Sequence, residues 1–224
     1  IDRAGLVGED GATHAGVFDF GFLRCVPNMV IAAPKDENEC YHLLNTCYEY
    51  PGCTAVRYPR GTGTGADIEQ PAQTYKVGEA VVESVLGKTD APYKLALLAF
   101  GTMVTTAQQA AETLINNDAA LDCQIQVVNM RWVKPLDTAM LETLLAQGVT
   151  HIATLEEHMI MGGAGNAVNE YLLNESAAFK QSRPAIANIG IPDRFIAHGS
   201  QAEQLADCGL DVEGVIKQLK ILLS

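Results

Sequence analysis

The sequence lacks the features that would mark a membrane protein, a metal centre or a nucleic-acid surface. No apolar run approaches the roughly 20 residues that a membrane-spanning helix requires. The six cysteines show neither Cys-x-x-Cys pairs nor metal-ligand spacing, so we expect free, buried thiols in a reducing compartment. Positive charge is scarce, because 15 Lys and Arg residues stand against 27 Asp and Glu residues. The net charge of −12 disfavours general binding to nucleic acids or anionic membranes.

The remaining composition is that of an ordinary globular protein. The 224 residues are 48% hydrophobic and 19% charged, which suffices for one large domain or two modest ones. The chain begins with Ile1 rather than Met, and a glycine-rich loop with ionisable side chains begins as early as residue 8. We therefore expect the chain to be the back part of a larger protein.

Strand and helix patterns alternate along the first part of the chain. They predict a strand over 29–33, a helix that Asp36 caps with Glu39 in the capping-box position, and a strand over 54–59. A strand–helix–strand unit of this kind implies parallel strands. Residues 61–75 are polar, punctuated by glycine and without periodicity, and this composition predicts a linker.

Beyond the linker the same alternation resumes. The expected strands span 94–100, 124–128, 151–155 and 185–191, and the expected helices span 105–115, 137–146, 162–173 and 212–223. We expect a compact, doubly wound α/β domain of about five strands.

A glycine-rich loop over residues 8–16 is the most informative feature of the chain. Its glycines favour an irregular backbone that can approach a ligand closely, and the loop carries Asp10 and His14. These two side chains suit acid–base chemistry, phosphate binding or simply a turn.

Arginines lie on both sides of this loop in the sequence. Arg3 precedes it, and Arg57 and Arg60 lie at the end of a predicted strand, where open α/β sheets bind ligands. Guanidinium groups suit phosphate because their planar fork donates two parallel hydrogen bonds. The alternative for Arg57 and Arg60 is a pair of surface ion pairs at the strand end.

A second glycine cluster, over 161–165, precedes a predicted helix. It lacks the Lys-Ser/Thr of a P-loop and the spacing of G-x-G-x-x-G, so it predicts a tight strand-to-helix turn rather than a phosphate cradle. Glu156, Glu157 and His158 come just before it, either as polar site or interface residues or as a solvated strand end. His42 lies within the first amphipathic helix, where we expect a structural role.

Several longer motifs follow one another over essentially the whole chain. They are Ile1-Asp2-Arg3-Ala4-Gly5-Leu6-Val7-Gly8, Asp10-Gly11-Ala12-Thr13-His14-Ala15-Gly16, Pro34-Lys35-Asp36-Glu37-Asn38-Glu39, Arg57-Tyr58-Pro59-Arg60-Gly61, Met130-Arg131-Trp132-Val133-Lys134-Pro135-Leu136-Asp137, Glu156-Glu157-His158 through Gly165, and Asn188-Ile189-Gly190-Ile191-Pro192-Asp193. Together, and in this order, they resemble the 1-deoxy-D-xylulose-5-phosphate synthase family of the transketolase superfamily.

The resemblance implies a fold and an activity. Residues 1–62 would be the C-terminal part of a pyrimidine-binding domain, 63–75 a linker, and 76–224 a transketolase C-terminal domain. The enzyme would be a transferase that uses thiamine diphosphate and Mg²⁺ to join pyruvate to D-glyceraldehyde 3-phosphate, giving 1-deoxy-D-xylulose 5-phosphate and CO₂. The thiamine cofactor would act as the electron sink. The reaction would serve isoprenoid synthesis by the non-mevalonate pathway, and thiamine biosynthesis.

The resemblance also assigns roles, position by position, to four residues. Arg3 and Arg60 would bind the phosphate of the aldehyde. Asp10 and His14 would face the reactive carbon of the cofactor, where Asp10 would orient a substrate hydroxyl or imidazole and His14 would steer protons. The family's diphosphate-binding segment with its magnesium ligands, and its cofactor-activating glutamate, have no counterpart in the chain. We therefore expect the chain to be inactive alone and to need the missing N-terminal half of the same protein.

Two other functions are compatible with part of this pattern. A β subunit of a 2-oxo-acid dehydrogenase decarboxylating component has the same two domains, although the Asp-Gly-x-Thr-His loop and the Arg-Tyr-Pro-Arg-Gly motif fit the synthase better. A non-catalytic dimerisation module would give Arg3, Asp10, His14 and Arg60 no role. We expect a homodimer in a bacterial cytoplasm, with a plastid stroma as the alternative.

Overall fold

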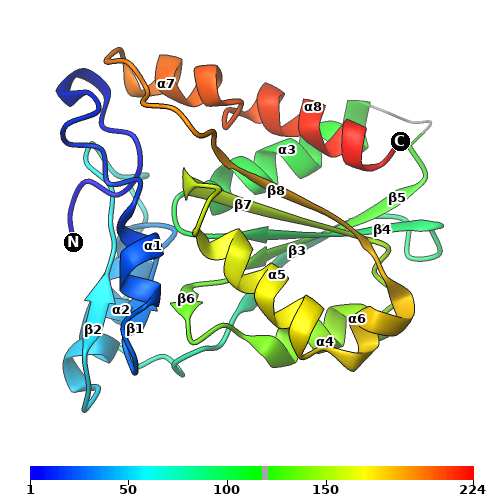
Figure 1. Cartoon of the computed structure of the whole chain (residues 1–224), viewed down its shortest axis with the longest axis horizontal. Coiled ribbons are helices and arrows are strands. Elements are labelled where there is room, and N and C mark those ends of the chain that lie inside the picture. The colour runs from blue at the N-terminus through cyan, green and yellow to red at the C-terminus, as the bar shows by residue number, and fades with distance from the viewer. Residues whose placement is uncertain (118–120) are drawn as a thin grey trace.

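The computed structural model describes residues 1–117 and 121–224, which form two β-sheets flanked by helices (Figure 1). The smaller sheet has the strand order β2-β1-β6, and the larger has the order β3-β5-β4-β7-β8. Within the described ranges, no helix is both long enough and apolar enough to cross a membrane.

The small sheet is built on the predicted strand–helix–strand unit. Its strands β1 (Val30–Ala32) and β2 (Thr54–Val56) are parallel, and helix α2 (Glu37–Glu49) connects them. The Asp36 carboxylate caps α2 by accepting a hydrogen bond of 2.8 Å from the Glu39 amide. The Glu39 carboxylate accepts from the Lys35 amide instead of closing back onto Asp36. The expected capping box is therefore only half formed.

The third strand of the small sheet comes from the second half of the chain. Strand β6 (Trp132–Lys134) pairs antiparallel with β1. Trp132, the single tryptophan, is completely buried among apolar side chains of β1, α2 and β2. Periodicity does not predict so short a strand, so the joining of the two halves through β6 appears only in the structure.

The large sheet confirms the doubly wound α/β fold. Its strands are β3 (Val81–Gly87), β4 (Tyr93–Ala99), β5 (Cys123–Asn129), β7 (His151–Met159) and β8 (Ala185–Ile191). The four strands β5, β4, β7 and β8 run parallel, whereas β3 is an antiparallel edge strand. The apolar pattern does not indicate β3, because no side chain of this edge strand is fully buried.

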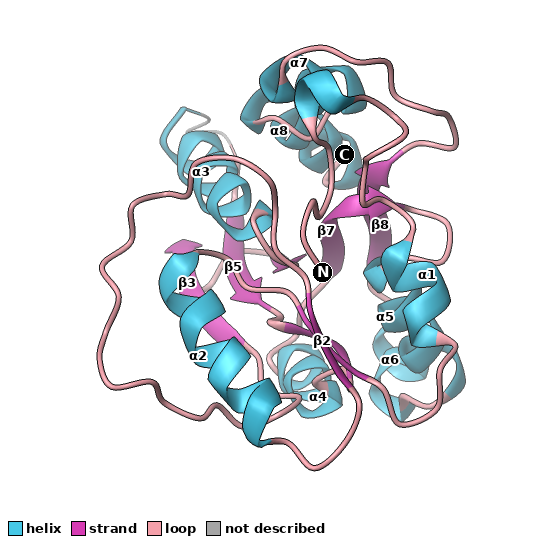
Figure 2. Cartoon of the chain, turned by 90° about the vertical axis from the view of Figure 1, so that its left-hand side faces the viewer, coloured by secondary structure: helices cyan, strands magenta, loops and turns pink. Residues whose placement is uncertain are grey.

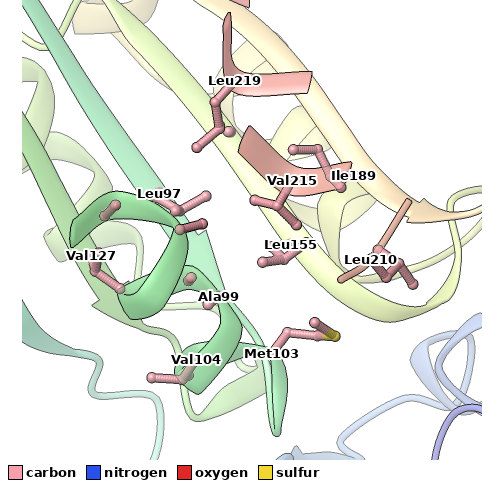
Figure 3. Packing of buried hydrophobic residues seen from close by; sticks show 14 of the residues in the cluster. Leu97, Ala99, Met103, Val104, Val127, Leu155, Ile189, Leu210, Val215 and Leu219 are labelled. Atoms are coloured by element: carbon pink, nitrogen blue, oxygen red, sulfur yellow. The ribbon is translucent and has the colours of Figure 1, made fainter. Parts of the chain in front are cut away.

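Helices cover both faces of the large sheet (Figure 1). Helices α3 (Met103–Asn117) and α8 (Val212–Leu222) cover one face, and α4 (Thr138–Ala146), α5 (Ala164–Asn174) and α6 (Ala177–Ser182) cover the other. Successive side chains of β4 point to opposite faces of the large sheet, as strand geometry requires. Leu97 and Ala99 join the cluster beneath α3 and α8 (Figure 3), and Leu98 joins the cluster on the opposite face. Both faces are thus buried, which explains the continuous apolar run of this strand.

Helix α1 (Asp19–Arg24) connects the start of the chain to the large sheet. It lies beside α5 (Figure 2), where Arg24 donates hydrogen bonds of 2.9 and 2.8 Å to the carbonyls of Gly162 and Gly163. The first 25 residues are therefore attached to the C-terminal half as well as to the small sheet.

The six cysteines are all free thiols, as expected. Cys47 and Cys123 are buried, but Cys25 and Cys53 are exposed, so the expectation of burial is wrong for these two. Both exposed cysteines lie in irregular segments outside the apolar faces of the helices and strands.

Candidate functional site

The candidate site is a loop, which we call the N-terminal loop (residues 3–16), closed at its base by glycines. Gly5 and Gly16 exchange backbone hydrogen bonds of 2.9 and 3.0 Å. A Cβ on Gly16 would collide with the carbonyl of Arg3, so the two ends of the loop meet this closely only because residue 16 is glycine.

The tip of the N-terminal loop contacts helix α7 (Gln201–Cys208) in the C-terminal half (Figure 1). The side-chain amide of Gln204 binds both backbone groups of Gly8, accepting from its N–H at 2.8 Å and donating to its carbonyl at 3.2 Å. Gln201 donates to the Leu6 carbonyl at 3.0 Å. Sequence reasoning missed both glutamines, because an amide on a surface helix carries no signal of its partner.

Arg3 and Arg60 converge on one carboxylate of the N-terminal loop. Asp10 Oδ2 lies 3.1 Å from Arg60 Nε and 3.8 Å from Arg3 Nε. The side chains of Arg3 and Arg60 are 42% and 48% exposed, so solvent reaches both. Arg3 also adopts a left-handed backbone conformation with φ 58°, which is uncommon for a residue with a side chain and is found more often at functional sites. The structure therefore brings three of the four predicted site residues together.

His14 is the fourth predicted residue and lies on the same loop. Its side chain is exposed, and its Nδ1 atom is 3.0 Å from the Thr13 hydroxyl. That contact leaves Nε2 facing away from Thr13 and open to exchange a proton with a ligand.

Arg57 differs from Arg3 and Arg60 because its side chain is buried. It forms an ion pair of 2.7 Å with Asp19, and both side chains are 6% exposed. It also donates to the backbone carbonyls of Gly16 and Glu157. Burial contradicts both interpretations of Arg57, as a phosphate ligand at the strand end and as a surface ion pair. Arg57 instead crosslinks the N-terminal loop, α1 and β7 from inside.

The second glycine cluster is a turn whose helix end is already occupied. The amides of Ala164 and Gly165, at the start of α5, donate to the Glu156 carboxylate at 2.6 and 2.8 Å. A carboxylate at this position satisfies free N–H groups and interacts favourably with the helix dipole. The protein's own side chain therefore fills the place that a phosphate would need, as the turn interpretation predicts.

Glu156, Glu157 and His158 are buried, so the alternative of a solvated strand end is wrong. Strand β7 continues to Met159, four residues beyond the predicted end, and carries all three residues into the interior. Burial raises the pKa of Glu156 to about 7, against the lowering effect of its two backbone hydrogen bonds. Burial, and then the charge of Arg57, lower the pKa of His158 to about 4, so its imidazole is neutral at physiological pH.

His42 has the structural role expected of it. It is completely buried in α2, and its Nδ1 atom accepts a hydrogen bond of 3.0 Å from the Gln73 amide. This contact fixes the segment that follows the small sheet.

Two further features bear on ligand binding. Within residues 1–117 and 121–224, no group of three or more His, Cys, Asp or Glu side chains could hold a metal ion. A cavity of about 380 Å³ lies between α2 and residues 58–64, with Tyr41 and Tyr58 among its lining residues. None of the four predicted site residues lines this cavity.

Comparison with known proteins gives two matching domains. Residues 1–64 match the description "Transketolase, pyrimidine binding domain", and residues 87–215 match "Transketolase, C-terminal domain". A solved structure titled "Split gene transketolase, inactive beta4 tetramer" superimposes with a TM-score of 0.76. It is 22% identical, and the match covers 99% of this chain and 65% of that one, which supports the fold.

Curated relatives resemble the chain much more strongly in sequence. The chain is 81% identical to 1-deoxy-D-xylulose-5-phosphate synthase of Psychrobacter arcticus and 82% identical to that of Psychrobacter cryohalolentis, over all of its length. It is 46% identical to the Acinetobacter baumannii protein of the same name over 98% of its length. In each case the chain spans about a third of the relative, 33% of its length.

Proposed function

Because the chain belongs to the transketolase family, we propose that it forms the part of a 1-deoxy-D-xylulose-5-phosphate synthase that binds the phosphorylated aldehyde. The complete enzyme would condense pyruvate with D-glyceraldehyde 3-phosphate and release CO₂. The observation that carries this proposal is the approach of Arg3 and Arg60 to the same oxygen of Asp10.

The geometry suits a dianionic ligand for an electrostatic reason. Arg3 and Arg60 both lie beside the Asp10 carboxylate, and Arg3 also pairs with the Asp2 carboxylate at 3.0 Å. The two arginines therefore gather positive charge at one place on a chain whose net charge is −12. The side chains of Arg3 and Arg60 are 42% and 48% exposed, so their accessible N–H groups can donate to a phosphate oxygen. A phosphate bound here would place the rest of a three-carbon aldehyde along the N-terminal loop, on which His14 lies.

Asp10 and His14 would handle orientation and protons. Asp10 already lies between the arginines, so it would accept a hydrogen bond from a substrate hydroxyl once phosphate engages them. His14 would exchange a proton at Nε2 with the oxygen that forms the new hydroxyl.

Thiamine diphosphate and Mg²⁺ are proposed for the complete enzyme rather than for this chain. The described residues do not provide a cluster of metal-ligating side chains, and the sequence lacks a Gly-Asp-Gly segment. The cofactor would supply the electron sink for decarboxylation and carbon–carbon bond formation. We further propose that the remaining part of the protein contributes these sites, that the chain is inactive alone, and that the enzyme is a cytoplasmic homodimer.

Substituting the arginines in the full-length protein tests the proposal. We expect Arg60→Ala and Arg3→Ala each to raise the KM for D-glyceraldehyde 3-phosphate by about 10–100-fold, because each removes a charge-assisted hydrogen bond of about 1.5–3 kcal/mol. The KM for pyruvate should stay within about twofold of wild type. The KM for unphosphorylated D-glyceraldehyde should also change little, because this aldehyde has no phosphate to lose.

A matched control is Arg183→Ala, an arginine at the end of α6 that lies away from the N-terminal loop. Unchanged kinetics in all of Arg3→Ala, Asp10→Ala, His14→Ala and Arg60→Ala would refute the proposal and support the non-catalytic dimerisation module. Transfer of the acyl group to lipoamide would instead support the dehydrogenase subunit.

A further inference from the structure

Glu157, on β7, anchors the N-terminal loop through its side chain. Its carboxylate accepts a hydrogen bond of 2.6 Å from the Leu6 amide and one of 3.2 Å from the Thr102 hydroxyl. Leu6 lies three residues after Arg3 and four before Asp10, so the bond fixes the backbone between the two. The residue is 5% exposed, which excludes solvent from competing for this bond.

The backbone of Glu157 holds the other end of the same loop. Arg57 Nη2 donates to the Glu157 carbonyl at 2.9 Å and also to the Gly16 carbonyl. Residue 157 is thus connected directly to Leu6 at the start of the loop and, through one guanidinium group, to Gly16 at its end.

Gly5 shows how closely the loop passes over this carboxylate. A Cβ at residue 5 would collide with the carboxyl group of Glu157, and the φ of Gly5 is 76°. Gly5 therefore permits both the turn and the close approach. Without the Glu157 side chain, the Leu6 amide would lose its partner in a buried place.

Burying the charged Glu157 carboxylate is energetically unfavourable. Burial raises the pKa of Glu157, while the Leu6 amide, the charge of Arg57 and the Thr102 hydroxyl lower it. An apolar side chain would pack in the same space without this cost, so packing alone does not account for a glutamate here.

We propose that Glu157 is a positioning residue, which acts through the Leu6 amide and the Gly16 carbonyl to hold Arg3 and Asp10 where the aldehyde phosphate binds. This inference rests on the proposed function of the N-terminal loop.

The test compares Glu157→Ala, Glu157→Gln and the adjacent Glu156→Gln in the full-length enzyme. Glu157→Ala should raise the KM for D-glyceraldehyde 3-phosphate about tenfold, with kcat and the KM for pyruvate within about twofold of wild type. Glu157→Gln keeps an acceptor for the Leu6 amide, so it should restore the KM to within about threefold. Glu156→Gln, whose carboxylate contacts α5 and not the loop, should lower the melting temperature without changing the KM ratio of the two substrates.

Amide hydrogen exchange at Leu6 gives a second readout that needs no activity. Exchange should accelerate about tenfold or more in Glu157→Ala and stay near wild type in Glu156→Gln. Equal losses for both substrates, unaltered Leu6 exchange, or a KM change in Glu156→Gln as large as that in Glu157→Ala would each overturn the inference. A wild-type protein without carboligation would refute the proposed function instead, and the exchange at Leu6 would still decide whether Glu157 anchors the loop.

Discussion

Buried ionisable side chains distinguish this chain at the scale of single residues. Arg57, Asp19, Glu156, Glu157 and His158 are all buried, and each lies beside an opposite charge or a backbone partner. Burial without such partners would cost several kcal/mol per charge. The sequence singles out the run Glu156-Glu157-His158 but does not indicate that it is buried, because a charged run at a strand end is normally solvated. Only the continuation of β7 to Met159 reveals their environment.

The raised pKa of Glu156 predicts a pH-dependent stability. The pKa of Glu156 is about 7 in the folded state, against an ordinary 4.5. Its contribution to the free energy of unfolding is therefore fully present below about pH 4.5 and is lost as the pH rises to about 7. The difference amounts to about 3 kcal/mol at 1.36 kcal/mol per pKa unit. Urea unfolding of wild type and Glu156→Gln at several pH values measures it.

His158 changes the stability in the opposite direction over the same pH range. Its pKa is lowered to about 4, so its contribution is present above about pH 6.5 and is lost as the pH falls toward 4. The two effects partly cancel in the wild type, and the difference between wild type and Glu156→Gln isolates the carboxylate. Parallel pH curves for the two proteins would contradict the assignment.

At the scale of helices and strands, the sequence predicts those elements that interactions between nearby residues stabilise. The helix over 37–49 begins at Asp36, whose carboxylate caps it as the sequence indicates. Asp137 caps the helix over 138–146 in the same way, although only the structure shows that cap. The buried parallel strands follow from their apolar runs. Strands β3 and β6 escape prediction because their partners, β5 and β1, are distant in sequence and supply the pairing. The same reason hides the contacts of the N-terminal loop with Glu157 and Gln204.

Removing the cap of α2 should destabilise the small sheet. Asp36→Ala loses the hydrogen bond to the Glu39 amide and should lower the free energy of unfolding by about 1 kcal/mol. For a chain of this size that corresponds to a fall of about 2–4 °C in melting temperature. Differential scanning calorimetry measures the shift, with the exposed Asp67→Ala as a control that should leave it unchanged. An equal shift in both variants would argue against the cap.

At the scale of the whole molecule, the polar segment after the small sheet is held along helix α2. Glu37 accepts hydrogen bonds from the Thr64 hydroxyl at 2.8 Å and the Gly65 amide at 2.7 Å. Asn38 and Thr46 accept from the amides of Glu69 and Tyr75. Composition predicts a segment without periodicity, and it has none, but several of its backbone N–H groups donate to polar side chains of helix α2.

Limited proteolysis can detect this attachment. Glu37→Ala removes both bonds to residues 64 and 65, so cleavage near this point should accelerate several-fold over wild type. Glu49→Ala, an exposed carboxylate at the other end of the same helix, should leave the cleavage rate unchanged. Identical digestion of wild type and Glu37→Ala would mean that other contacts hold the segment.

The position of Trp132 gives the molecule an internal fluorophore at the seam between its halves. The indole belongs to the later part of the chain, yet it is enclosed by Leu43, Cys47 and Val56 from the earlier part. Its emission would shift to longer wavelength as soon as water entered between them, even if each half kept its own secondary structure. Intrinsic fluorescence therefore reports separation of the halves, while circular dichroism reports their unfolding.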